Sequence, residues 1–251
     1  MGERQSVIDL RDVLAAVGFL TRLPVPVDGE WAATRGARSA WAYPLAGVLV
    51  GFALFFFVLI SLTLGLPSPI SAALGLAAVI FMTGALHEDG LADTMDGLWG
   101  GYERERRLEI MKDSRIGTYG VLALVLTVLI TWLALTELVG SGALWALVVV
   151  PVASRAVMPV MMLLPQARPG GVSATVGQPP RVTAVIATII GALSLYPLEW
   201  AGAAVGLVMA SAAAIVGSLA MRKIGGQTGD IIGATQQLTQ LAGWLTLVAM
   251  L

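Results

Sequence analysis

The sequence lacks cysteine entirely and contains one histidine among its 251 residues. Without cysteine the chain can form no disulfide, no thiolate metal site and no thiol nucleophile. Charged residues are also scarce, at 12% of the chain against roughly 25% in ordinary globular domains. The net charge of -1 supplies no basic surface, so we expect no nucleic-acid partner.

Apolar residues, in contrast, are abundant: they make up 57% of the chain, and the mean hydropathy is +0.84. These values predict an all-α, polytopic membrane protein that forms a single integral membrane domain over residues 1–251, in contact with the lipid bilayer. About seven apolar runs are long enough to cross a membrane: 42–64, 68–86, 119–139, 143–164, 182–198, 201–221 and 231–251. A short amphipathic helix is expected before them at 6–20, ended by Leu23-Pro24-Val25-Pro26 because proline disfavours helix.

The distribution of the basic residues tests this division into seven spans. With seven spans, fourteen of the fifteen Lys and Arg residues fall in segments on one side of the membrane: Arg4, Arg11, Arg22, Arg35, Arg38, Arg104, Arg106, Arg107, Lys112, Arg115, Arg168, Arg181, Arg222 and Lys223. The positive-inside rule makes that side cytoplasmic. We therefore expect residues 1–40 to form a cytoplasmic or interfacial segment and residues 87–118 to form a cytoplasmic acidic loop.

The stretch from His87 to Gly97 carries the clearest chemical signal. It contains the only histidine and four carboxylates, Glu88, Asp89, Asp93 and Asp96. If the stretch is helical, the three aspartates lie on one face at i, i+4 and i+7. Such a set suits Mg²⁺, with Mn²⁺ as the second choice, and that ion suits phosphate-bearing substrates. The alternative is a solvated acidic patch that caps a helix, and a break at Gly90 would leave only Asp93 and Asp96 as a pair.

Two further segments are rich in glycine and fall on the same predicted side. Residues Asp113-Ser114-Arg115-Ile116-Gly117 combine a carboxylate, an arginine and a glycine in a composition that suits a phosphate-binding turn. Residues Gly225 to Asp230 open the last apolar run, where Asp230 is expected to act as an N-cap. This second turn lacks the Gly-Lys-Ser/Thr end of a P-loop.

Some residues have a structural interpretation beside a functional one. Arg155 falls deep in the fourth run, where an ion pair with a neighbouring helix and a role in binding phosphate are both open. Gly47 and Gly51 form a Gly-x-x-x-Gly pair that predicts close helix packing. The methionines Met158 and Met162 are expected to pack rather than to bind a ligand.

Several ordered motifs of the chain resemble those of the cobalamin (5'-phosphate) synthase family, also called adenosylcobinamide-GDP ribazoletransferase. They cover most of the chain and are Phe19–Pro26, Tyr43–Gly47, His87–Gly97, Arg107–Gly120, Ser154-Arg155 and Gly225–Asp230. Two positions depart from the pattern: Glu88 is acidic where the family often has a non-acidic residue, and Gln237 and Gln240 stand in the closing helix where the family often has an acidic one.

The resemblance implies a transferase of cobalamin (vitamin B12) biosynthesis in the inner or plasma membrane of a prokaryote. Its substrates would be adenosylcobinamide-GDP and α-ribazole or α-ribazole 5'-phosphate, and GMP would be released. Asp93, His87 and Asp113 are then the expected catalytic residues, and Glu88, Asp89, Asp93 and Asp96 the expected metal ligands. The substrate-binding residues expected from the same resemblance are Arg22, Arg115, Arg155, Gly226, Gln227, Thr228 and Asp230.

Two other functions are compatible with parts of the sequence. A CDP-alcohol phosphotransferase-like lipid enzyme shares the chemistry, but the Ala-Arg that follows the glycine of its signature is absent after Gly97. A small-molecule transporter would carry several charges in mid-membrane, where the sequence places only Arg155. The sequence also leaves open whether the protein forms a homo-oligomer or associates with other cobalamin-assembly enzymes.

Overall fold

The computed structural model describes residues 6–251, and within this range the chain is helical without any named strand. Residues 1–5, including Arg4 of the predicted N-terminal segment, lie outside the described residues. The order along the chain is α1 (Arg11–Leu20), α2 (Gly29–Arg35), η1 (Gly36–Ala42), α3 (Tyr43–Thr63), α4 (Ser68–Thr83), α5 (Leu86–Gly100), α6 (Arg104–Ile110), α7 (Thr118–Gly140), α8 (Ala146–Met161), α9 (Val172–Val176), α10 (Arg181–Leu195), η2 (Tyr196–Leu198), α11 (Glu199–Ile224) and α12 (Gly229–Val248).

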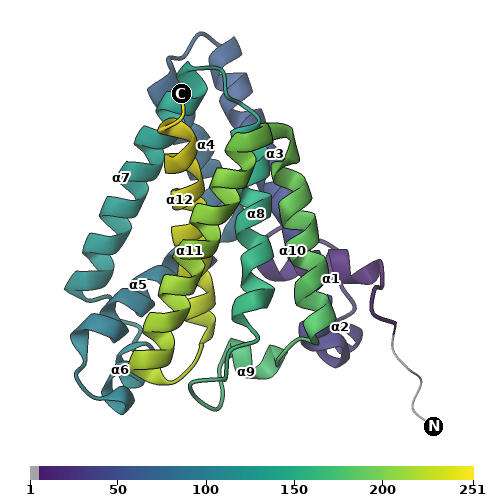
Figure 1. Cartoon of the computed structure of the whole chain (residues 1–251), viewed down its shortest axis with the longest axis vertical. Helices are drawn as coiled ribbons and strands as arrows, with labels where there is room; N and C mark the ends of the chain where they lie inside the picture. The colour runs from purple at the N-terminus through teal and green to yellow at the C-terminus, as the bar shows by residue number, and fades with distance from the viewer. Residues whose placement is uncertain (1–5) are drawn as a thin grey trace.

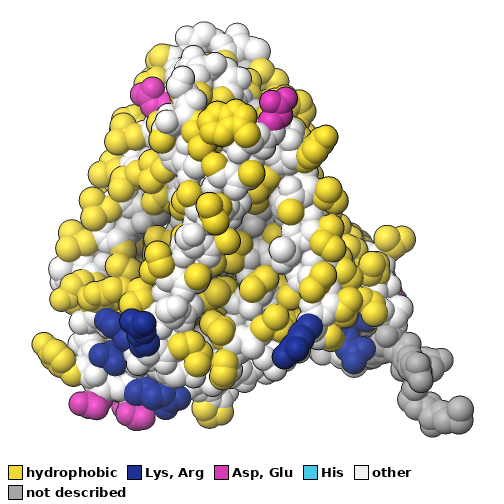
Figure 2. Space-filling model, viewed as in Figure 1, with side chains coloured by type: hydrophobic (Ala, Val, Ile, Leu, Met, Phe, Trp, Pro, Cys, Tyr) yellow, Lys and Arg dark blue, Asp and Glu magenta, His cyan; other side chains and the backbone are white. Residues whose placement is uncertain are grey.

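The long helices form a tapering bundle, and the short helices α1, α2, α6 and α9 gather at its wide end (Figure 1). Figure 2 shows hydrophobic side chains over most of this face, with Lys and Arg side chains gathered at the wide end. The all-helical class is therefore confirmed, and the basic residues visible on this face concentrate at one end as the sequence predicts.

The structure contains three to four candidate membrane spans, where the sequence predicted about seven. Three stretches are long and apolar enough to cross a membrane: Gly29–Thr63, Thr118–Gly140 and Arg181–Ile224. A fourth results if α4 and α5, which meet at 86°, form one broken span. The prediction of seven spans is not confirmed, because the apolar runs included turn residues and helices such as α8, with 16 residues, are shorter than the roughly 20 that a full crossing needs. The third stretch contains both α10 and α11, which run side by side in Figure 1.

The break between α4 and α5 is the main departure from the predicted loop at 87–118. Gly84 and Ala85 both adopt left-handed backbone conformations, with φ of 64° and 56°. The chain becomes helical again at Leu86 and stays so through Gly90 to Gly100. The acidic stretch is therefore a helix, and the conformation that puts Asp89 and Asp93 on one face is present.

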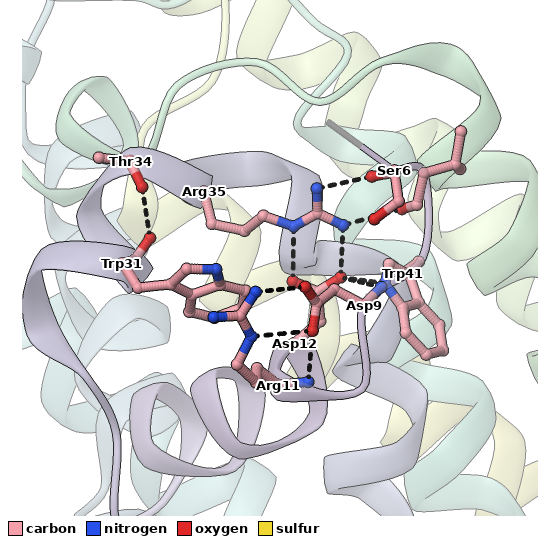
Figure 3. A network of polar contacts seen from close by, with 9 residues as sticks. Ser6, Asp9, Arg11, Asp12, Trp31, Thr34, Arg35 and Trp41 are labelled. Carbon is pink, nitrogen blue, oxygen red and sulfur yellow. Dashed lines mark hydrogen bonds and ion pairs between the residues drawn. The ribbon is translucent and has the colours of Figure 1, made fainter. Parts of the chain in front are cut away.

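The N-terminal segment is held by a buried ion pair between α1 and α2 (Figure 3). Arg35 donates to both carboxylate oxygens of Asp12 at 2.7 Å, and the indole N–H of Trp41 donates to the same carboxylate at 2.6 Å. Arg35 also donates to the carbonyls of Ser6 and Val7, so its charge is well compensated although the pair is buried. This network accounts for the start of α1 at Arg11 rather than at the predicted residue 6, since the carbonyls of Ser6 and Val7 accept hydrogen bonds from Arg35.

The Gly-x-x-x-Gly pair of α3 packs against α8 as the sequence predicts. A Cβ atom at Gly47 would lie 2.7 Å from the carbonyl oxygen of Pro151, and one at Gly51 would lie 2.7 Å from the Cα of Val148. Both neighbours are backbone atoms that cannot rotate away. The two glycines therefore set the distance between α3 and α8.

We expect Gly51→Ala to destabilise the protein by about 1–3 kcal/mol, because the added methyl group must push α8 away. Gly206→Ala in α11 is the matched control, since its Cβ would meet only Leu195 Cδ1 at an ordinary 3.5 Å. Thermal unfolding of the purified protein in detergent measures both variants. Equal midpoints for Gly51→Ala and Gly206→Ala would contradict the packing role.

Candidate functional site

The acidic helix α5 crosses α12 at a point where both helices carry glycine. A Cβ at Gly90 would lie 3.0 Å from the carbonyl oxygen of Asp230, and a Cβ at Gly233 would lie 3.4 Å from the Cα of His87. The two backbones are thus in direct contact. As a result, the predicted acidic stretch and the predicted Gly225–Asp230 turn lie side by side.

This crossing assembles a cluster of carboxylates. Asp89 and Asp93 occupy successive turns of α5, and the charges that act most strongly on Asp93 are those of Asp230, Asp89 and Asp96. Arg168 opposes them and donates to the Asp230 carboxylate at 3.2 Å. Asp93 is half-buried and Asp89 exposed. A cluster with more negative than positive charge is suited to a cation and to a ligand that carries one.

Asp96 has a different environment from the other two aspartates. It is buried, and its carboxylate accepts hydrogen bonds from the backbone N–H groups of Gly117 at 2.6 Å and Gly120 at 2.9 Å. These donors belong to the first turn of α7 and the residue before it. Asp96 therefore anchors the N-terminus of α7 to α5, where a negative charge also complements the helix dipole.

Glu88 lies apart from the aspartate cluster, near Arg155 and Gln237. Arg155 is 1% exposed and donates to the carbonyl of Pro151 at 3.2 Å and to Gln240 Oε1 at 3.5 Å. The opposite charges of Glu88 and Arg155 act on each other. This arrangement favours the structural interpretation of Arg155, a charge pair between helices, over direct contact with substrate phosphate.

A cavity of about 280 Å³ lies beside the carboxylates and receives residues from six parts of the chain. Its walls come from α1, the start of α3, α5, α8, the 166–176 segment and the start of α12. The polar, sulfur-containing and aromatic side chains on these walls include those of Phe19, Tyr43, His87, Asp89, Met158, Met162, Gln166, Arg168, Ser173, Gln227, Thr228 and Asp230. Residues predicted separately from the sequence thus share one cavity.

Two buried groups on the cavity wall have no hydrogen-bond partner within the part of the chain that the structure describes. Both ring nitrogens of His87 are free, and so is the amide nitrogen of Gln227. Each side chain is 1% exposed. Buried polar groups are nearly always paired in folded proteins, so these two are candidates for contact with a ligand.

The Gly225–Asp230 turn is fixed by the loop that follows α8. Gln227 donates its backbone N–H to the carbonyl of Pro165 at 2.8 Å and accepts from the N–H of Ala167 at 2.9 Å. A Cβ at Gly226 would clash with Pro165, so only glycine fits there. The predicted N-cap is wrong by two residues: the hydroxyl of Thr228 accepts from the N–H of Ile231 and caps α12. Asp230 already lies in the first turn of the helix, where its carboxylate faces Arg168.

Eight of the predicted site residues do not line the cavity: Arg22, Glu88, Asp93, Asp96, Asp113, Arg115, Arg155 and Gly226. Arg22 is exposed at the α4–α5 bend, where its backbone N–H donates to the carbonyl of Met82, and it lines a different groove. Asp113 and Arg115 pair with each other at 2.7 Å on the surface before α7. The guanidinium of Arg115 lowers the pKa of Asp113 to about 2, which makes Asp113 a weak base.

The structure also adds residues that the sequence did not single out for the site. Arg168 and Ser173 lie in the 165–181 loop, and Tyr43 and Phe19 stack with ring centroids 6.0 Å apart. Arg168 was visible in the sequence only as one basic residue on the predicted cytoplasmic side. Its position beside Asp230 could have been inferred only from the pairing of its loop with the Gly225–Asp230 turn.

No group of three acidic, histidine or cysteine side chains within residues 6–251 is arranged to bind a metal by itself. The aspartates nevertheless fit a Mg²⁺ ion that is shared with a substrate, because Mg²⁺ is commonly held by one or two carboxylates together with substrate phosphates and water. The chemistry of the donors, all oxygen, agrees with this ion.

The fold and the cavity together define an all-helical membrane protein with an acidic, nucleoside-sized site at the wide end of the bundle. The chain matches the cobalamin-5-phosphate synthase family over residues 12–248 and belongs to this family. It is similar to the adenosylcobinamide-GDP ribazoletransferase of Bradyrhizobium diazoefficiens, with 47% identity over 95% of this chain and 92% of that protein. Proteins of the same name from Mesorhizobium japonicum (44% identity, 93% of this chain and 91% of that protein) and Azorhizobium caulinodans (43% identity, 93% of each chain) are also similar.

No solved structure matches the chain. The family assignment confirms the resemblance drawn from the sequence motifs. It does not favour either alternative, the CDP-alcohol phosphotransferase-like enzyme or the transporter.

We expect Asp96→Asn to destabilise the start of α7, because an NH₂ group replaces one of the two oxygens that accept backbone N–H groups. The local stability of this turn should fall by about 1–3 kcal/mol. Hydrogen exchange at Gly117 and Gly120 measures it, and both amides should exchange faster than in the unmodified protein. Asp93→Asn is the matched control, since no hydrogen bond to Asp93 is found among the described residues. Unchanged exchange in Asp96→Asn would contradict the anchoring role.

Proposed function

We propose that this protein is a membrane-bound transferase that joins adenosylcobinamide-GDP to α-ribazole, or to α-ribazole 5'-phosphate, and releases GMP. The names of its relatives support the reaction. The observation that carries the proposal is the Gly90–Gly233 contact, which sets Asp89 and Asp93 beside Asp230 at the edge of a nucleoside-sized cavity.

The reaction exchanges a phosphoanhydride bond for a phosphoester bond. The 3'-hydroxyl oxygen of the ribazole ribose attacks the phosphorus attached to the cobinamide arm. The bond from this phosphorus to the oxygen that bridges to GMP breaks, and the hydroxyl proton passes to a base. The protein must therefore hold a diphosphate, align a hydroxyl and accept a proton.

Asp89, Asp93 and Asp230 are the residues that would hold Mg²⁺, with Mn²⁺ as the second choice. When bound, this ion would neutralise negative charge on the diphosphate and on the leaving phosphate. Glu88 and Asp96, also expected as ligands from the sequence, have other partners: the charge of Arg155 acts on Glu88, and Asp96 accepts a hydrogen bond from the α7 backbone. We assign them to support of the site.

His87 and Asp93 are the residues proposed to orient the attacking hydroxyl and to accept its proton. His87 has free ring nitrogens on the cavity wall, and a neutral imidazole has one ring nitrogen that accepts a proton. Arg168 is proposed to bind a phosphate oxygen, since its guanidinium lies on the same wall as Asp230. Asp113, whose pKa is about 2, is assigned no proton transfer.

The site is proposed to face the cytoplasm, because it lies at the wide end where basic side chains gather. Both substrates and GMP are water-soluble compounds, which this face would supply. Substrate exchange would then need no passage through the bilayer.

We expect Asp93→Asn to reduce GMP release by at least about 100-fold while the protein stays folded, because one charge of the proposed cation site is lost. The assay uses full-length protein in detergent with adenosylcobinamide-GDP, α-ribazole and Mg²⁺. Chelation of the divalent ion should have the same effect on the unmodified protein, and added Mg²⁺ should restore activity.

Glu109→Gln is the matched control, because Glu109 is an exposed carboxylate paired with Arg106 on the surface. Its activity should equal that of the unmodified protein. Substantial activity in Asp93→Asn would overturn the role of that carboxylate, and full activity after chelation would overturn the proposed metal dependence. Absence of GMP release from the unmodified protein would contradict the proposed reaction itself.

A further inference from the structure

The cavity combines an apolar, aromatic wall with an acidic edge. Tyr43, Met158 and Met162 belong to one buried hydrophobic cluster, and the Phe19 ring stacks on Tyr43 at an interplanar angle of 24°. The charged carboxylates of Asp89 and Asp230 belong to the same cavity lining. A ligand that fits both must have a flat apolar ring and a polar, oxygen-rich part.

The buried wall presents one fixed amide donor to such a ligand. The hydroxyl of Ser173 donates to Gln227 Oε1 at 2.7 Å, so the amide oxygen is already engaged. Gln227 Nε2 is buried without a partner among residues 6–251. The backbone of Gln227 is held by Pro165 and Ala167, which leaves the side chain little freedom to turn elsewhere.

We propose that this cavity is the α-ribazole site, in which the dimethylbenzimidazole ring lies among Phe19, Tyr43, Met158 and Met162 and Gln227 Nε2 donates to its free ring nitrogen. The inference rests on the proposed function and names which of the two substrates the cavity takes. The ribose then extends toward His87 and Asp89. Its 3'-hydroxyl thereby reaches the carboxylate edge, where the diphosphate of the second substrate is expected.

The number of polar atoms on each ring decides between the two nucleosides of the reaction. Dimethylbenzimidazole, once attached to ribose, has a single polar ring atom that needs a partner, a nitrogen that accepts. Guanine has a carbonyl, an amino group, a ring N–H and two acceptor nitrogens. The unpaired side-chain groups on the described cavity wall are Gln227 Nε2 and the His87 ring, which suffice for the first ring and leave most of guanine unpaired.

The size of the cavity also favours α-ribazole as its ligand. At about 280 Å³ it lies just below the common range of about 300–1,000 Å³ for small-ligand pockets. It can hold one nucleoside but not a corrin ring together with its nucleotide. The corrin and the guanosine must therefore lie outside it.

The test compares kinetics for the two substrates in Gln227→Leu, measured on full-length protein in detergent. We expect the KM for α-ribazole to rise at least about tenfold, because one hydrogen bond to the ring is lost. The KM for adenosylcobinamide-GDP should stay within about twofold. A rise confined to adenosylcobinamide-GDP, an equal rise for both, or no change would each overturn the assignment.

A ribazole analogue with C–H in place of the free ring nitrogen provides a test without mutation. The unmodified protein should bind this analogue at least about tenfold more weakly than α-ribazole, and Gln227→Leu should bind the two equally. Equal binding of both compounds by the unmodified protein would overturn the proposed hydrogen bond, even if Gln227→Leu did not fold. Gln178→Leu is the matched control, since Gln178 is exposed and lies outside the cavity lining.

Binding measurements test the assignment of the cavity independently of the proposed reaction. Equilibrium dialysis with α-ribazole and with guanosine needs no turnover. If the unmodified protein released no GMP but bound α-ribazole in preference to guanosine, and Gln227→Leu lost that preference, the reaction would fail while the site assignment stood. Preference for guanosine would overturn the site assignment whatever the activity.

Discussion

The site depends on the contact between two helices that both carry glycine at their crossing. The backbone of α5 at Gly90 packs against the backbone of α12, because a Cβ at Gly90 would lie 3.0 Å from the carbonyl oxygen of Asp230 and 3.4 Å from the Cα of Gly233. Carboxylates repel one another, and in an apolar bundle they would lie apart unless the backbone forced them together. The close packing at Gly90 holds the two backbones together, so the acidic residues of α5 and α12 face one small volume beside the cavity. A ligand that carries a cation then relieves the repulsion.

Other polar contacts fix the two helices in this position. At its start α5 turns away from α4 through the left-handed residues Gly84 and Ala85. Farther along, Asp96 attaches α5 to the first turn of α7. In α12, Gln236 and Gln240 bond to each other and to Ser154 of α8 inside the bundle. In an apolar interior such bonds are directional, whereas apolar contacts alone let helices slide past each other.

The sequence predicted the composition of the site better than its geometry. His87, Asp89, Gln227, Thr228 and Asp230, all predicted from motifs, line the cavity together. Spacing could place Asp89, Asp93 and Asp96 on one helix face, but it could not reveal that both oxygens of Asp96 already bind backbone amides. Arg168 and Ser173 were not identified because their loop has no motif, and only its pairing with the Gly225–Asp230 turn brings them to the cavity. The seven predicted spans were not confirmed, because hydropathy counts turn residues with the helices.

By itself the sequence determined the helical class of the protein, because long continuous apolar runs favour helices, which satisfy their backbone hydrogen bonds internally. It also determined the family, since long ordered motifs such as His87–Gly97 are specific. Only the tertiary structure decided which polar residues face a ligand and which support the fold. The reason is that this choice depends on contacts between residues far apart in the chain, such as Gly90 with Gly233, and local spacing contains no information about them.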